Sequence, residues 1–198
     1  MLSPLHYFGI PDAPWEGIVS NYFKSIAFGE PIISSSSVAI PKQIFAECGV
    51  FYLGEKLGED QDCWLRIALK HPIAFSTRIC SFYYIDADNR ATFTNYAIEG
   101  YRLVSTALEA EQNGVVTGAD AFYLREYANR HLLISAWHCI LAGQPRMALR
   151  HLHRCETRLF KRRKLWCMVW ACVPSFVTKK IKKYVKSRRV AHSSQSFA

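Results

Sequence analysis

The stretch that most constrains this chain is residues 58–69, where an acidic cluster runs directly into an amphipathic segment. It reads Gly-Glu-Asp-Gln-Asp-Cys-Trp-Leu-Arg-Ile-Ala-Leu, with three carboxylates within four positions. The apolar residues behind the acids recur at the spacing of one helix face: Trp64, Leu65, Ala68 and Leu69. We therefore predict a helix that carries Glu59 and Asp60 on its first turn and is anchored by these four side chains.

Carboxylates at a helix start have two interpretations. Acids near a helix N-terminus complement the macrodipole and stabilise the helix by roughly 0.3–1 kcal/mol each. A carboxylate on a rigid helix start can also serve as a general base. The acids alone favour the first interpretation, and the flanking sequence is needed to weigh the second.

The flanks of this segment follow a recognisable order. Residues 1–20 are rich in proline and aromatic side chains and are predicted to be irregular, and a short helix is predicted over 21–28. A small-residue stretch at 32–40, predicted as a strand, and a short helix over 41–48, ended by Gly49, then precede the acidic segment. After it come predicted strands at 73–75 and 81–85. Together with the Glu-Asp-x-Asp-x-Trp-Leu-Arg string, this order over residues 20–95 resembles the C-terminal half of the catalytic domain of family 2 glycosyltransferases. The resemblance implies an α/β fold, the C-terminal half of a GT-A (Rossmann-like) domain, followed by a helical appendage.

The resemblance also implies roles for individual residues. Asp60 would be the catalytic base, with Glu59 beside it, and would take the proton from an acceptor hydroxyl that attacks a nucleotide sugar with inversion. Substrate contacts would come from Asp62, Trp64, Arg66, Ser36 and Ser37. The serines have a second interpretation, because small hydroxyl side chains also pack well beneath a sheet. The leaving diphosphate would require a divalent cation, Mg²⁺ or Mn²⁺.

An Asp-x-Asp pair, Asp86 and Asp88, follows the predicted strand at 81–85. In the family the metal-binding Asp-x-Asp precedes the Glu-Asp pair, whereas this pair comes after it. Family members often complete the metal or diphosphate site with a residue just after this strand, a role that Asp86 or Asp88 could take. The alternative is an ordinary turn, because Asp and Asn are common turn residues. The position in the chain favours the turn.

The nucleotide-binding half of such an enzyme would precede residue 20 or so. No strand–helix–strand unit fits there, since one such unit needs about 30 residues. We therefore expect a truncated glycosyltransferase, or one whose N-terminal half is a separate chain. By itself this chain is expected to bind no nucleotide sugar and to be inactive.

Composition bears on the cellular compartment. No apolar run reaches the roughly 18–20 residues that cross a bilayer, and the N-terminus lacks the basic start and apolar core of a signal peptide. The seven cysteines are scattered without a Cys-x-x-Cys pair, which argues against a zinc site or a disulfide framework. We expect reduced thiols and a cytoplasmic protein.

Charge divides the chain into an acidic body and a basic tail. Residues 1–143 hold 10 Lys and Arg against 15 Asp and Glu, a net charge of −5. Residues 144–198 hold 15 Lys and Arg and one acid, a net charge of +14. Such a tail suggests contact with a polyanion.

Three helical patterns follow the predicted strands, at 97–112, at 120–141 and from Pro145 onward. We therefore divide the chain into a partial GT-A domain, a helical appendage and a basic tail, at 1–95, 96–160 and 161–198. The histidines of the appendage are not spaced to place a pair on one helix face at ligand distance. We expect surface or boundary positions for them: His131, His138, His151 and His153.

The tail combines a 13-residue apolar stretch, residues 165–177, with basic runs at 161–164 and 179–186. With Trp166 and Trp170 at headgroup depth, it is typical of an interfacial segment that lies on anionic lipid. The alternative is a core helix with a solvated basic end. Nucleic acid is a weaker interpretation, because no binding module accompanies the charge.

Two functions of different classes follow. The first is a glycosyltransferase that moves a sugar from a nucleotide sugar to a lipid-linked or polysaccharide acceptor, as in lipopolysaccharide assembly, on the cytoplasmic face of the inner membrane. The second is non-catalytic, either a basic membrane-surface protein or an inactive remnant of the enzyme. Binding of a nucleotide sugar discriminates between them.

Overall fold

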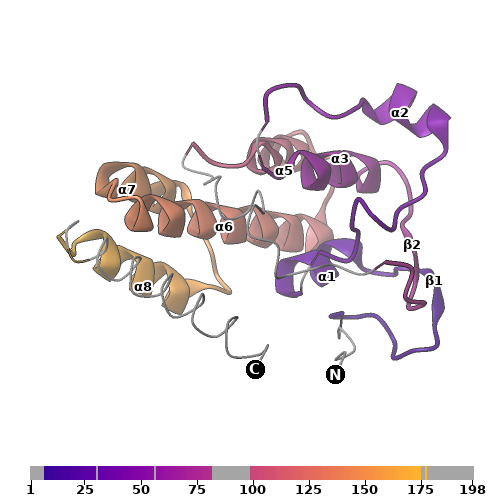
Figure 1. Cartoon of the computed structure of the whole chain (residues 1–198), viewed down its shortest axis with the longest axis horizontal. Coiled ribbons are helices and arrows are strands. Elements are labelled where there is room, and N and C mark those ends of the chain that lie inside the picture. The colour runs from indigo at the N-terminus through magenta and orange to yellow at the C-terminus, as the bar shows by residue number, and fades with distance from the viewer. Residues whose placement is uncertain (1–6, 30, 56, 82–98, 175–176, 178–198) are drawn as a thin grey trace, which may run out of the picture. The chain divides into compact units, whose positions relative to one another are not determined.

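A computed structural model describes residues 7–29, 31–55, 57–81, 99–174 and 177. The described part of the chain is mostly helical and contains one small sheet (Figure 1). Its elements in chain order are β1 (Glu16–Ile18), α1 (Tyr22–Phe28), α2 (Lys42–Cys48), α3 (Glu59–Ala68), β2 (Ala74–Ser76), α5 (Arg102–Gln112), α6 (Gly118–Leu141), α7 (Pro145–Arg154) and α8 (Lys161–Ala171).

The chain forms two compact units. The first comprises residues 1–83 and 102–130, and the second comprises residues 84–101 and 131–198, so that the boundary falls within α6. This grouping differs from the predicted three-part division, because α5 packs against α3 and therefore belongs to the first unit.

The first unit contains a two-stranded antiparallel sheet. β1 pairs with β2, and Gly17 lies opposite Phe75. The predicted strand at 73–75 is confirmed to within one residue, whereas the prediction that residues 1–20 are irregular is wrong for β1. A strand of three residues is too short to show a recognisable alternation of apolar and polar side chains in the sequence.

The predicted strand at 32–40 is wrong. Residues 34–37 form a turn, in which the Ser34 hydroxyl accepts a hydrogen bond from Ser36 N at 3.3 Å. Serine side chains compete in this way for backbone N–H groups, which favours turns over strands. The predicted strand at 81–85 lies, apart from its first residue, outside the described part of the chain.

The first two helices lie where they were predicted, to within one residue. α1 begins after Asn21, whose Oδ1 accepts a hydrogen bond from Lys24 N at 3.0 Å. α2 ends at Gly49, whose φ of 78° is a conformation that glycine alone adopts readily. A Cβ at this position would lie 2.9 Å from the Arg66 guanidinium, so glycine is also required by the close approach of that side chain.

α3 provides the centre of the core in the first unit. Trp64 is 4% exposed, and Cys63 and Leu65 are fully buried. This confirms the prediction that Trp64 and Leu65 anchor the helix. Buried Cys48 and Ile67 join Trp64 in one cluster, against which partly buried residues from the preceding loop, α2 and the approach to β2 pack: Ile33, Val38, Ile40, Ile44, Phe45 and Ile73.

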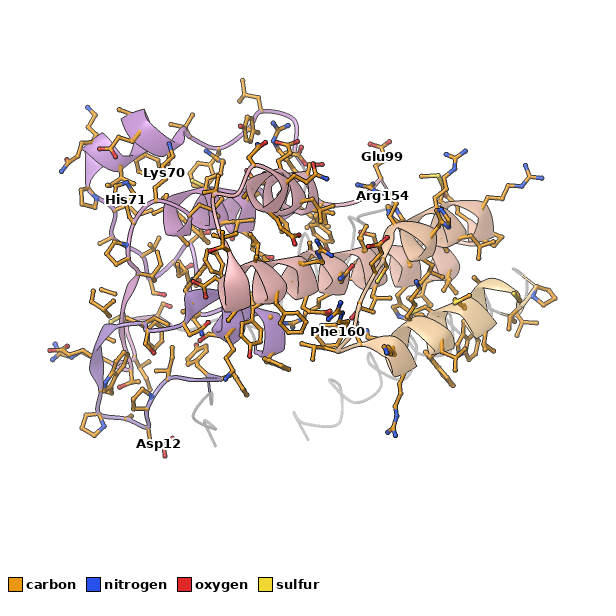
Figure 2. The ribbon with its side chains drawn as sticks, turned by 180° about the vertical axis from the view of Figure 1, so that it is seen from behind. Asp12, Lys70, His71, Glu99, Arg154 and Phe160 are labelled. Atoms are coloured by element: carbon orange, nitrogen blue, oxygen red, sulfur yellow. The ribbon has the colours of Figure 1, made fainter. Side chains whose placement is uncertain are left out.

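Two residues that follow α3 tie its C-terminal end to α2. Lys70 Nζ donates a hydrogen bond to Glu47 O at 2.8 Å, and His71 Nε2 lies 3.0 Å from Glu47 Oε2 (Figure 2). At the opposite end of the helix, Glu59, Asp60 and Gln61 are partly exposed.

The second unit is built from helices. α7 packs against α8, and Trp137 of α6 meets Trp170 of α8 with ring centroids 6.1 Å apart. The helical patterns at 120–141 and from Pro145 onward are confirmed. In the described part of the chain, no helix combines the length and the apolar character needed to cross a bilayer.

The helix predicted from residue 97 begins later than expected. α5 starts at Arg102, and the residues described before it, 99–101, are not helical. Gly100 has a φ of 105°, which is incompatible with a right-handed helix. Within residues 99–112, the helix therefore extends only from Arg102 onward.

Two of the four histidines are buried, so the prediction of surface or boundary positions is wrong for them. His131 is 6% exposed and His151 is 4% exposed, whereas His138 and His153 are partly or fully exposed as predicted. His131 packs edge-on against the Tyr101 ring, with centroids 4.8 Å apart. The residue that covers it lies 30 positions away in sequence, so local spacing gives no sign of the contact.

All seven cysteines are free thiols, of which only Cys80 and Cys172 are exposed. Burial raises the pKa of the Cys139 thiol to about 11, and burial also raises the pKa of Cys63 and of Cys167. The reactive thiolate is therefore scarce at these three positions. We expect a chromogenic disulfide reagent at neutral pH to titrate the two exposed thiols rapidly in the folded chain and all seven in denaturant. Rapid reaction of a third thiol would contradict the packing of the units.

Candidate functional site

The candidate site lies at the first turn of α3. Gly58 precedes the helix with a φ of 81° and a ψ of 12°, a left-handed conformation that reverses the chain just before Glu59. Gly58 O accepts the first helical hydrogen bond, from Asp62 N at 2.9 Å. Glu59 and Asp60 both occupy the first turn and are both partly exposed. The predicted placement of these two acids is confirmed.

The structure brings Asp60 together with the serine turn. Ser35 Oγ donates a hydrogen bond to Asp60 Oδ2 at 3.0 Å, across 25 positions of sequence. The other carboxylate oxygen, Oδ1, accepts a hydrogen bond from Gln61 N at 2.7 Å. One oxygen of Asp60 is thus held by the helix, while the other meets a hydroxyl group at an exposed position.

Sequence reasoning singled out Ser36 and Ser37 from this turn, but the serine that contacts Asp60 is Ser35. Ser36 and Ser37 are exposed, and Ser37 N closes the turn by bonding Ser34 O at 3.0 Å. Four consecutive serines give no signal that distinguishes one from another. The identity of the contact depends on the turn geometry. The substrate-binding role of Ser36 and Ser37 stays a prediction.

Asp62 lies within a buried polar network and is 1% exposed. Its Oδ2 accepts a hydrogen bond from Arg66 Nε at 2.9 Å, and its Oδ1 accepts one from Thr106 Oγ1 at 2.5 Å. Thr106 belongs to α5, so the network joins the two helices that pack around the site. A carboxylate with both oxygens engaged in this way acts first as a structural group, and its predicted contact with substrate stays a prediction.

Arg66 connects α3 to the loop that follows α2. Its two terminal nitrogens donate to carbonyl oxygens of that loop, one to Cys48 O and the other to Val50 O at 2.8 Å. Its guanidinium also lies over the Tyr52 ring, 4.8 Å from the centroid. Arg102 of α5 lies over the same ring at 3.5 Å. All three nitrogens of Arg66 are engaged, Nε with Asp62 and the two terminal nitrogens with the loop. A direct contact with substrate stays a prediction.

Loss of the Thr106 hydroxyl should loosen the link between α3 and α5. A hydrogen bond to a charged group contributes about 1.5–3 kcal/mol, and the acceptor here is almost fully buried. We expect Thr106→Val to lower the free energy of unfolding by that amount in urea titrations followed by circular dichroism. Ser105→Ala, at the exposed neighbouring position, is the matched control and should change stability by less than about 0.5 kcal/mol. Equal stability of the two variants would remove Thr106 from the network.

Of the remaining predicted site residues, Trp64 faces the core. Trp64 is 4% exposed and meets the Phe51 ring edge-on, with centroids 5.8 Å apart, so its ring serves the core. Asp86 and Asp88 lie outside the described residues. Among the residues that are described, no group of three or more His, Cys, Asp or Glu side chains could hold a metal ion.

In comparisons with known proteins, no family model, curated protein or solved structure matches this chain.

Proposed function

We propose that this chain is the acceptor-side part of an inverting glycosyltransferase of the family 2 type, with Asp60 as the catalytic base. The observation that supports the proposal is the hydrogen bond of 3.0 Å from Ser35 Oγ to Asp60 Oδ2. A base must lie within about 2.6–3.2 Å of the oxygen from which it takes a proton. Asp60 therefore already holds a hydroxyl group at the distance that the reaction requires.

In the proposed reaction, Asp60 Oδ2 accepts the proton of an acceptor hydroxyl. The oxygen forms a bond to the anomeric carbon of the donor sugar while the bond from that carbon to the nucleotide diphosphate breaks. The diphosphate leaves with the electron pair, and the configuration at the anomeric carbon inverts. Removal of the proton by a positioned base typically accelerates such a step by about 10²–10⁴-fold.

The surroundings of Asp60 suit a base in two respects. Its Oδ1 is held by Gln61 N at 2.7 Å, which leaves Oδ2 to face the acceptor. The buried pair of Asp62 and Arg66, with Thr106, holds the first turn of α3 to α5 and to the loop after α2. An acceptor hydroxyl would replace the Ser35 hydroxyl at Oδ2.

The donor side of the proposal comes from the family resemblance. In the resembled enzymes, a GT-A domain binds the nucleotide sugar, and a divalent cation, Mg²⁺ or Mn²⁺, neutralises the leaving diphosphate. The described residues offer no cluster that fits such a cation, so we derive no step through it. We propose further that the acceptor is a lipid-linked saccharide or polysaccharide and that the reaction takes place at the cytoplasmic face of the inner membrane.

A second candidate function is binding to a membrane surface without catalysis. The observation that favours it is α8, a helix whose exposed face is apolar and whose first turn is basic. It is compatible with the first candidate, since a lipid-linked acceptor would also be held at a membrane. Transfer activity separates the two functions.

The test is a transfer assay on two forms of the protein. One is the chain itself, in membranes of cells that produce it. The other, called here the joined enzyme, is the chain placed behind the nucleotide-binding half of a family 2 glycosyltransferase. Both are incubated with radiolabelled nucleotide sugars and Mg²⁺ or Mn²⁺, and glycolipid and polysaccharide products are separated. We expect transfer by the joined enzyme. Absence of transfer from every donor in both forms would count against the proposal and favour the non-catalytic function.

A further inference from the structure

The exposed face of α8 is apolar, although the helix lies in the most basic part of the chain. Leu165, Trp166 and Val169 are 63%, 57% and 56% exposed. They recur at the spacing of one helix face, and Met168, which is 44% exposed, flanks them. Contiguous patches of large, exposed apolar side chains are uncommon on soluble proteins, and such patches mark interaction surfaces. We call Leu165, Trp166 and Val169 the outer face of α8.

The opposite face of α8 is committed to the second unit. Cys167 and Ala171 are 2% and 6% exposed, and Trp170 is partly buried against Trp137. Lys164 is also directed inward, because its Nζ donates a hydrogen bond to Cys155 O at 2.6 Å. The core of the unit is therefore complete on one side of the helix, and the outer face is not part of it.

Cations border the outer face at one end. Lys161, Arg162 and Arg163 form the first turn of α8, just after Phe160 (Figure 2), and all three are exposed. The sequence from 157 to 177 contains no acidic residue. Apolar side chains beside exposed cations match a surface that offers both hydrocarbon and negative charge.

We propose that the outer face of α8 binds the surface of an anionic lipid bilayer. Leu165, Trp166 and Val169 enter the boundary between headgroups and acyl chains, and the cations of the first turn meet lipid phosphates. Trp166 is the tryptophan at headgroup depth. Trp170, which the sequence also suggested for that position, stays in the protein core.

A second copy of the chain is a poorer occupant than a bilayer. A symmetric contact through the outer face would bring two identical basic segments together. Residues 144–198 carry +14 in each copy, so the contact would be opposed by like charges. An anionic bilayer instead neutralises them, and each basic residue near its surface strengthens binding by a factor of about five.

This proposal adds a contact surface to the membrane location that we proposed above. It rests on that proposed function for the kind of membrane. Lipid binding and sugar transfer are measured in separate assays. Unchanged lipid binding in variants of the outer face would overturn that face of α8 as the membrane contact, whatever the transfer assay shows. Loss of transfer with intact binding would overturn only the catalytic proposal.

The first experiment measures co-sedimentation of the full chain with vesicles of phosphatidylcholine, alone or mixed with phosphatidylglycerol. We expect binding only to the mixed vesicles and weaker binding as salt increases, because exposed charges are screened beyond about 8 Å at physiological ionic strength. The double variant Leu165→Gln, Val169→Gln should bind at least about tenfold more weakly. Leu149→Gln, at a 45% exposed leucine of α7, is the matched control and should bind as the unaltered chain does. Equal binding by the double variant and the control would overturn the proposal.

The second experiment tests the charged end of the face. Arg162→Gln combined with Arg163→Gln should weaken binding roughly 30-fold, at about fivefold for each cation. Arg146→Gln combined with Arg150→Gln removes the same charge from exposed positions of α7 and should have the smaller effect. Equal loss in both pairs would mean that only net charge matters and would overturn the assignment to α8.

The third experiment reports the depth of individual tryptophans. Vesicles that contain lipids brominated on the acyl chains quench a tryptophan only when it inserts. We expect quenching to persist in Trp170→Phe and to be lost in Trp166→Phe. Quenching that survives in Trp166→Phe would overturn insertion of the outer face. If the Leu165→Gln, Val169→Gln variant instead converted a dimer into a monomer in sedimentation velocity, with vesicle binding unchanged, the occupant would be a second copy and the lipid proposal would fail.

Discussion

Replacement of Asp60 by Asn should lower the turnover of the joined enzyme by at least about 100-fold. The amide keeps the shape of the side chain and can still accept a hydrogen bond from Ser35, but it cannot take up a proton from the acceptor. Stability should change little, because Asp60 is partly exposed and lies on the first turn of α3. Initial rates of sugar transfer at saturating donor, together with urea titrations, measure the two effects.

The controls separate loss of the base from loss of charge or fold. Glu109→Gln removes an exposed carboxylate from α5 of the same unit and should leave turnover within about twofold, as expected for a substitution remote from the chemistry. Asp62→Asn should lower both activity and stability, because it disturbs the buried pair with Arg66. Turnover of Asp60→Asn close to that of the unaltered enzyme would remove Asp60 from the mechanism.

Truncation of Trp64 to Ala should lower the free energy of unfolding by roughly 3–5 kcal/mol. The ring is 4% exposed and lies in the cluster with Cys48, Cys63 and Ile67, so its removal leaves a cavity that the loop and helices around it can only partly fill. Domains are typically stable by about 5–15 kcal/mol, and a loss of this size is a large fraction of the total.

Unfolding in urea, followed by circular dichroism, measures this loss. Trp64→Phe is included because it retains an aromatic ring and should keep the chain folded if Trp64→Ala does not. Trp166→Ala removes the same type of side chain from a position that is 57% exposed and whose ring meets Trp170 with centroids 5.6 Å apart. It should change stability by less than about 1.5 kcal/mol. Equal effects of Trp64→Ala and Trp166→Ala would contradict the assignment of Trp64 to the core.

The position of α3 could be predicted because several local signals agree there. A glycine, three acids and an apolar repeat define the start, the first turn and the buried face within twelve residues. The same kind of agreement located α1, where Asn21 caps the helix, and the end of α2 at Gly49. Such signals are local, because a helix satisfies its backbone hydrogen bonds within a few residues.

The contacts of the candidate site could not be predicted in this way. Ser35 reaches Asp60 across 25 positions, and Thr106 reaches Asp62 across 44. The residues next to Ser35 and Thr106 in the sequence do not identify the side chain that each contacts. The pairs meet only because α5 packs on α3 and because residues 34–37 form a turn. The strand predicted at 32–40 failed for a related reason, since the side chains of the serines there bond the backbone locally.

Local patterns in the sequence are sufficient to predict that α3 carries acids on its first turn above a buried apolar face, and that the segment after residue 143 is basic. The packing of the folded chain is what makes Asp62 a buried structural group while Asp60 meets a hydroxyl at the surface. Packing also sets which side of α8 is buried. Nearly every position from Leu165 to Val169 is apolar, so periodicity cannot separate two faces. The separation comes from α7 and Trp137, which cover Cys167 and Trp170 and leave Trp166 exposed.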